Sequence, residues 1–127
     1  MNILLDTHAF MWFVNGDTQL GVNARQRIEH PDNTNYMSIG SLWEIAIKIN
    51  IGKLRLLYPY DTVIQQIEEN GIELLPIKFI HTQQLIDLPL HHRDPFDRLI
   101  ISQALTENMT VITRDENFNL YPIEIIW

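Results

Sequence analysis

The chain alternates short apolar runs with longer segments whose apolar residues recur at helical spacing. The short runs predict buried strands at residues 2–5, 35–38, 72–75, 110–113 and 122–126. The longer segments predict helices at residues 7–14, 21–29, 39–50, 60–70, 78–87 and 94–108. Because strands and helices alternate throughout, we expect a three-layer α/β/α fold with a mainly parallel central sheet.

The clearest helix start in the chain lies at Asp94-Pro95-Phe96-Asp97. Asp94 suits the N-cap, Pro95 suits the first helical position, and Asp97 falls in the first turn, where a carboxylate is favoured. The segment before it, residues 88–93, predicts a loop. A helix is therefore expected to place two carboxylates at its N-terminal end.

Composition places few limits on the class of protein. The length of 127 residues suits a single domain, residues 1–127, with a proper core. No apolar stretch is long enough to cross a membrane, and the N-terminus lacks the basic segment of a signal peptide. The absence of cysteine excludes disulfides and thiolate metal sites, and it fits a reducing compartment. We therefore expect a cytoplasmic protein that does not associate with a membrane.

The net charge is −7, from nine Lys plus Arg against sixteen Asp plus Glu. Such an acidic chain lacks the broad basic surface with which proteins usually bind nucleic acid non-specifically. The argument weakens if part of the negative charge belongs to a pocket that holds divalent cations. The distribution of the acidic residues therefore matters more than their total.

Acidic residues occur where four predicted segments begin or end: Asp6, Glu44, Asp97 and Asp115. Strand ends and helix starts meet at one edge of an α/β sheet, so these carboxylates can converge although they are scattered in sequence. Clusters of carboxylate oxygens bind hard cations such as Mg²⁺ or Mn²⁺. The pattern favours metal-assisted chemistry on phosphate esters.

A purely structural interpretation exists for two of these acids at predicted helix starts. Asp6 suits a helix N-cap. Ser41 and Glu44 have the spacing of a capping box, in which the glutamate only satisfies backbone N–H groups.

The other two acids have acidic neighbours that compete for the same role. Asp97 suits the positive end of a helix dipole, and Asp94 lies within the same helix start. Asp115 suits a turn, and Glu116 follows it directly. The choices between Asp94 and Asp97, and between Asp115 and Glu116, remain open at this point.

Four segments, residues 4–8, 41–48, 94–104 and 111–115, together resemble the PIN domain, and most closely the VapC-type toxins of type II toxin–antitoxin systems. The resemblance covers nearly the whole chain in the family's order. It is the ordered set of four segments that is specific, rather than any one of them. The resemblance implies the family's acidic quartet at Asp6, Glu44, Asp97 and Asp115.

The resemblance also implies an activity and partners. A PIN-domain toxin is an endoribonuclease that hydrolyses RNA phosphodiester bonds with Mg²⁺ or Mn²⁺ held by the quartet, some of the acids acting through water. A cognate antitoxin and a homodimer are implied as partners. Thr113 matches a hydroxyl that orients one of the acids. The competing hypothesis is a PIN-fold binding module that does not catalyse a reaction.

Cationic and aromatic residues near the acids are further candidates for contacts with RNA. Lys48, Arg93, Arg98 and Arg114 lie close to the acids in sequence. A solvated or salt-bridged helix position suits Arg98 at least as well as a phosphate contact. The cluster His91-His92-Arg93 favours a surface loop over a role in the site. Trp12 and Trp43 favour packing over stacking on bases.

Overall fold

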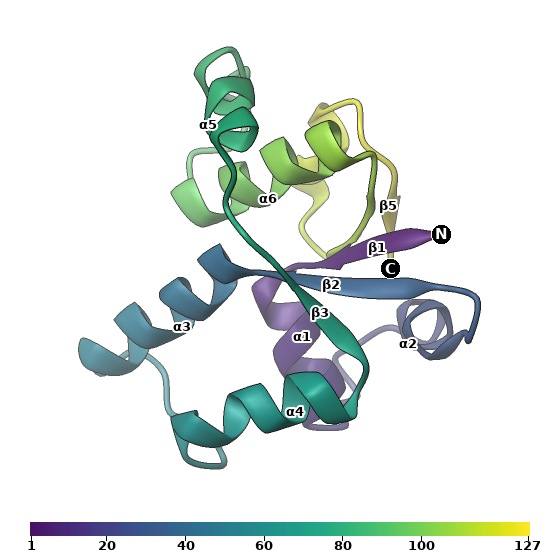
Figure 1. Cartoon of the computed structure of the whole chain (residues 1–127), viewed down its shortest axis with the longest axis vertical. Coiled ribbons are helices and arrows are strands. Elements are labelled where there is room, and N and C mark those ends of the chain that lie inside the picture. The colour runs from purple at the N-terminus through teal and green to yellow at the C-terminus, as the bar shows by residue number, and fades with distance from the viewer.

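Five parallel strands form the central sheet of the computed structural model, which describes residues 1–127 (Figure 1). The sheet order is β3-β2-β1-β4-β5, and every neighbouring pair is parallel. The strands are β1 (Asn2–Leu5), β2 (Thr34–Ser38), β3 (Ile72–Leu75), β4 (Thr110–Ile112) and β5 (Ile125–Ile126). The predicted α/β fold with a mainly parallel sheet is confirmed.

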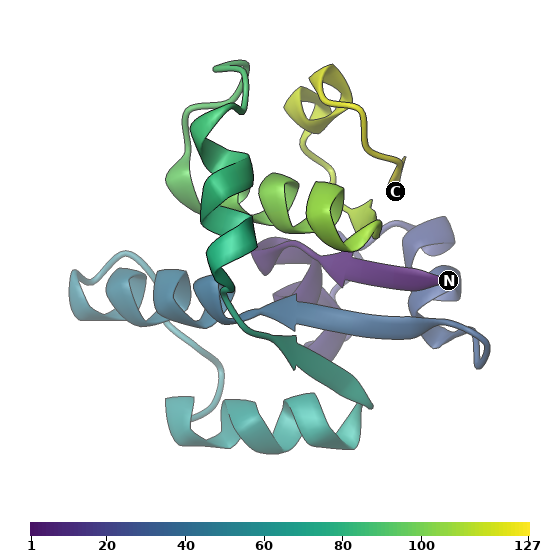
Figure 2. The same cartoon turned by 45° about the horizontal axis from the view of Figure 1, so that its top comes forward.

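Helices cover both faces of this sheet. They are α1 (Thr7–Val14), α2 (Val22–Glu29), α3 (Ile39–Asn50), α4 (Val63–Glu69), α5 (Phe79–Ile86) and α6 (Pro95–Glu107), with 3₁₀ turns η1 (Tyr60–Thr62) and η2 (Glu116–Leu120). Figure 2 shows α5 and α6 on one side of the sheet and α1 and α4 on the other. None of the helices is both long enough and apolar enough to span a bilayer.

Two apolar clusters form the core, one on each face of the sheet. Ile3 and Leu5 of β1 contact the cluster made with α1, α2 and α4, whereas Leu4 between them belongs to the cluster made with α6 and η2. Successive side chains of a strand point to opposite faces. A central strand that is covered on both faces must therefore be apolar at every position, which explains the uninterrupted run that precedes Asp6.

The predicted elements differ from the observed ones mainly at the C-terminal end. The strand expected over residues 122–126 is reduced to Ile125–Ile126. Pro122 has no N–H to donate to a neighbouring strand, and the β4 ladder is extended only as far back as Glu124, whose carbonyl accepts from Val111. The 3₁₀ turn η2 was not predicted, because its apolar residues are too few for a periodicity.

The carboxyl edge of the sheet is where the acidic segments meet. Asp6 follows β1 directly, and Ser38 at the end of β2 caps α3. Gly40 in the first turn of α3 lies against Leu99 of α6, and a Cβ at that glycine would clash with the leucine side chain. This close approach brings the N-terminal halves of α3 and α6 to the same edge, and with them Glu44 and Asp97.

Candidate active site

A pocket of about 270 Å³ opens at this edge of the sheet. Its lining residues come from the segments that follow β1 and β4, from α1 and from the start of α6: Asp6, His8, Trp12, Asp97, Arg114 and Asp115. Three of the four acids predicted from the sequence therefore surround one cavity. The fourth, Glu44, lies outside its lining.

Asp6 serves as a helix cap and a pocket residue at once. One of its carboxylate oxygens, Oδ1, accepts a hydrogen bond of 2.8 Å from the backbone N–H of Ala9, which caps α1. Burial raises the pKa of Asp6, while hydrogen bonds from the Thr113 side chain and the Ala9 N–H oppose the rise. The sequence left open whether Asp6 is a helix cap or a pocket residue, and in the structure it is both. The predicted contact of Thr113 with an acid is present.

Asp97 and Asp94 have separate positions in the structure. Asp94 is the N-cap of α6, and its Oδ1 accepts from the backbone N–H groups of Phe96 at 2.8 Å and Asp97 at 3.1 Å. Asp97 points into the pocket. The pKa of Asp97 is raised to about 7, mainly by burial and next by the charge of Asp94. His92 opposes the rise, and Asp6 and Glu44 add smaller contributions to it. Asp97 is the member of the pair that lines the cavity.

Asp115 and its neighbour Glu116 are likewise distinguished by position. Asp115 caps η2, since its Oδ1 accepts from the Asn117 N–H at 2.9 Å, and its own N–H donates to Thr113 Oγ1 at 3.0 Å. Asp115 lines the pocket, whereas Glu116 is exposed and does not. The short 3₁₀ turn thus directs the first acid inward and the second outward.

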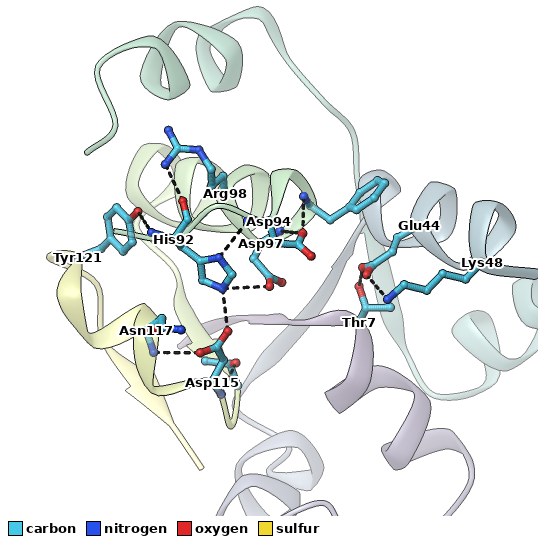
Figure 3. Close-up of polar contacts among 12 residues, drawn as sticks. Thr7, Glu44, Lys48, His92, Asp94, Asp97, Arg98, Asp115, Asn117 and Tyr121 are labelled. Carbon is cyan, nitrogen blue, oxygen red and sulfur yellow. Dashed lines mark hydrogen bonds and ion pairs between the residues drawn. The ribbon is translucent and has the colours of Figure 1, made fainter. Parts of the chain in front are cut away.

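Glu44 is buried beside the pocket with its own counter-charge. Its carboxylate accepts from Thr7 Oγ1 at 2.5 Å and pairs with Lys48 Nζ at 2.7 Å, one helical turn away (Figure 3). The capping-box interpretation is wrong, because Ser38 caps α3 and Glu44 lies in its second turn. Glu44 still contributes to the field of the pocket, since its charge raises the pKa of both Asp6 and Asp97.

His92 is the site residue that the sequence interpretation missed. Its ring is buried, and Nε2 lies 2.7 Å from Asp115 Oδ2 and 3.1 Å from Asp97 Oδ2 (Figure 3). The expectation of a surface loop holds for the exposed His91 and is wrong for His92. The available signal was the position of His92, two residues before the Asp94 cap and hence at the same edge of the sheet.

The cationic candidates have different surroundings. Arg98 donates to the backbone carbonyls of Leu88, Pro89 and His92 at 3.0 to 3.1 Å, so it stabilises the loop before α6 and neither contacts a carboxylate nor faces the pocket. Arg114 is the cation in the pocket lining, and its guanidinium lies 4.6 Å from the centre of the Trp12 ring.

The aromatic candidates also divide. Trp12 packs against His8 and Trp127, with ring centres 5.4 and 5.7 Å apart, and it forms one wall of the pocket. Trp43 packs edge to face against Phe96, yet it stays 61% exposed to solvent.

The donor set of the pocket fits a hard divalent cation. Its acidic groups offer oxygen ligands of the kind that Mg²⁺ and Mn²⁺ prefer. Asp97 and Asp115 each place an oxygen within 4.8 Å of the other and of His92 Nε2. The raised pKa of Asp97 and Asp6 means that ionising both without a nearby cation is unfavourable. Of the four acids, Asp6, Asp97 and Asp115 line the pocket, whereas Glu44 lies outside its lining and is paired with Lys48.

Comparison with known proteins gives a consistent picture of the chain. It is similar to Ribonuclease VapC22 of Mycobacterium tuberculosis, with 29% identity over 114 residues, covering 89% of this chain and 86% of that protein. The fold is similar to that of VapBC2 from Rickettsia felis bound to a promoter DNA fragment, at a TM-score of 0.72 and 18% identity over 99% of this chain and 98% of the other. It is also similar to VapBC-1 from nontypeable Haemophilus influenzae, at a TM-score of 0.67 and 18% identity over 99% and 97%. The PIN domain model matches residues 3–124, and the chain therefore belongs to the PIN domain family.

Proposed function

We propose that this protein is a metal-dependent endoribonuclease and the toxin of a type II toxin–antitoxin system. The observation that carries the proposal is the acidic pocket at the carboxyl edge of the sheet, lined by Asp6, Asp97 and Asp115, in a chain of the PIN domain family. The similarity to a protein named as a ribonuclease supports the same activity.

The pocket residues divide the work of phosphodiester hydrolysis. Asp6, Asp97 and Asp115 would hold Mg²⁺ or Mn²⁺. Such an ion, when bound, lowers the pKa of a water molecule and neutralises negative charge that develops on the phosphate. Arg114, which lines the same pocket, supplies a cation for a substrate phosphate. Lys48 pairs with Glu44, which offsets part of the negative charge that Glu44 adds beside the site.

The protonation state of Asp97 sets a condition for activity. With a pKa of about 7, this carboxyl is partly protonated at neutral pH in the metal-free protein. A protonated carboxyl binds a cation poorly, so the proton must leave as the ion binds. Metal affinity, and cleavage at limiting metal concentration, are therefore expected to rise with pH from about 6 to about 8.

The proposed partners are RNA, a cognate antitoxin and a second copy of the chain, all in the cytoplasm. The similar folds from Rickettsia felis and Haemophilus influenzae come from complexes described as VapBC, which supports an antitoxin. A cationic side chain of an antitoxin would be attracted to the acidic pocket for the same reason as a metal ion. Large exposed apolar side chains such as Trp43 and Phe79 suit protein–protein contacts.

RNA cleavage by the purified protein tests the proposed activity. We expect the wild-type chain to cut RNA in Mg²⁺ or Mn²⁺ and to lose activity in EDTA. Asp6→Asn and Asp97→Asn should each abolish cleavage with an unchanged circular dichroism spectrum. Glu116→Gln is the matched control, because it removes an exposed carboxylate next to Asp115 and should stay active. Cleavage by Asp6→Asn in EDTA would refute the proposal. A wild-type protein that binds metal but does not cleave RNA would favour a binding module.

A further inference from the structure

We infer that His92 is a positioning residue, which holds the carboxylate of Asp115 through an Nε2–H donor and is not itself a ligand of the metal. The inference rests on the proposed function, since it concerns the same pocket. The distances alone allow the opposite interpretation. His92, Asp97 and Asp115 each offer an atom within 4.8 Å of the others, as three ligands of one ion would.

The loop that carries His92 is held from both sides. The His92 backbone N–H donates to Tyr121 Oη at 2.8 Å, and the Tyr121 hydroxyl donates to the Pro89 carbonyl at 2.6 Å. Arg98 donates to the carbonyls of Pro89 and His92, both at 3.0 Å. The imidazole lies edge to face with Phe118, with ring centres 5.6 Å apart. The position and plane of the ring are thus set by its surroundings.

The neighbours of the two ring nitrogens determine which one carries the proton. The backbone N–H of Asp94 donates to His92 Nδ1 at 3.2 Å, so Nδ1 must present a lone pair. The hydrogen of the neutral imidazole is then on Nε2, which points to Asp115 Oδ2 at 2.7 Å. Metal ligation through Nε2 would need the opposite tautomer, whose Nδ1–H would face the Asp94 N–H, donor against donor.

This donor completes the hydrogen bonding of Asp115. Asp115 Oδ1 accepts from the Asn117 N–H at 2.9 Å, and Asp115 Oδ2 accepts from His92, so the carboxylate is held at both oxygens. The same His92 nitrogen lies 3.1 Å from Asp97 Oδ2, between the two acids (Figure 3). His92 therefore sets the orientation of Asp115 and its spacing from Asp97. Partners of this kind orient the ligands of a metal without binding the metal themselves.

Nitrogen NMR of the metal-free protein tests the tautomer directly. Long-range ¹H–¹⁵N spectra of protein labelled at histidine distinguish an Nε2–H ring from an Nδ1–H ring and from the charged ring. Loss of one ring's signals in His92→Gln assigns the resonances. We expect the Nε2–H tautomer at pH 8. Either of the other two forms would overturn the inference. The measurement does not depend on nuclease activity, so it stands or fails separately from the proposed function.

Manganese binding tests the consequence. We expect His92→Ala to weaken Mn²⁺ affinity by about 10- to 100-fold, as loss of such an orienting partner does in other metal sites. His92→Gln, whose amide can still donate to Asp115, should recover most of this loss, and the exposed control His91→Gln should bind like the wild type. Electron spin-echo spectra of the wild-type Mn²⁺ complex should lack the coupling of a directly bound ¹⁴N. A ¹⁴N coupling that disappears in His92→Gln would overturn the inference, and this holds even if His92→Ala does not fold.

Discussion

Replacing Asp97 by asparagine should stabilise the metal-free protein while it removes the proposed activity. In the folded chain Asp97 is partly removed from water and lies near the carboxylates of Asp94, Asp6 and Glu44, and these effects outweigh the opposing effect of His92. Its pKa is raised from 3.8 to about 7. The neutral amide of asparagine has nearly the same shape and does not carry the charge.

The sign and size of the effect follow from the two pKa values. Between pH 4 and pH 7 the folded protein binds more protons at Asp97 than the unfolded chain, so the free energy of unfolding falls as pH rises through this window. The difference between 3.8 and about 7 corresponds to about 4 kcal/mol, which is the upper bound above pH 7. The Asp97 side chain keeps 24% of its exposure, so we expect a gain of about 2–4 kcal/mol for Asp97→Asn at pH 8.

Urea denaturation followed by tryptophan fluorescence measures this gain. Wild type and Asp97→Asn are compared in EDTA at pH 5 and pH 8, and the advantage of the variant should be small at pH 5 and large at pH 8. Asp87→Asn is the control, because Asp87 is exposed at the end of α5 and should give no pH-dependent advantage. An equal difference between wild type and Asp97→Asn at both pH values would refute the reasoning.

Three further substitutions test the packing around the pocket. Lys48→Met leaves the buried Glu44 without its cation and should lower the free energy of unfolding, measured in urea, by about 1–3 kcal/mol. Adding Glu44→Gln to the same chain should restore most of the lost stability. A double variant as unstable as Lys48→Met would contradict the pairing. Gly40→Ala should cost about 1 kcal/mol, because the end of the Leu99 side chain must rotate away from the new Cβ. A gain in stability of the size that helix propensity alone gives to alanine would contradict the close approach of α3 and α6. Arg98→Lys removes the guanidinium group that donates to three loop carbonyls. Amide hydrogen exchange in the loop before α6 should therefore become about tenfold faster or more. Unchanged exchange would show that the arginine does not hold the loop.

Most of the fold was predictable because short stretches of sequence determine the type of each helix and strand. A buried parallel strand has to be apolar throughout, as β1 is, and the Asp94-Pro95 helix start is legible from the chemistry of two residues. The convergence of Asp6, Asp97 and Asp115 was predictable for the same reason, since parallel strands end at one edge. The alternation of strands and helices along the chain indicates a parallel sheet, and the topology of that sheet places residues that follow its strands at one edge.

The site roles that the sequence left open depend on the direction in which individual side chains point. Asp94 and Asp97 share one helix start, and only the cap hydrogen bonds decide that the first faces the backbone and the second faces the pocket. The roles of His92 and Arg98 depend on how residues 88–93 fold, and a loop without a periodic pattern does not reveal its hydrogen bonds.

Binding of Mn²⁺ to the metal-free protein, followed by titration calorimetry, tests the central claim most directly. The claim is that Asp6, Asp97 and Asp115 form a pocket for a divalent cation. We expect saturable binding by the wild type and by Glu116→Gln, loss of that binding in both Asp6→Asn and Asp97→Asn, and release of protons on binding near pH 7. Absence of binding by the wild type, or equal binding by Asp97→Asn, would contradict the claim.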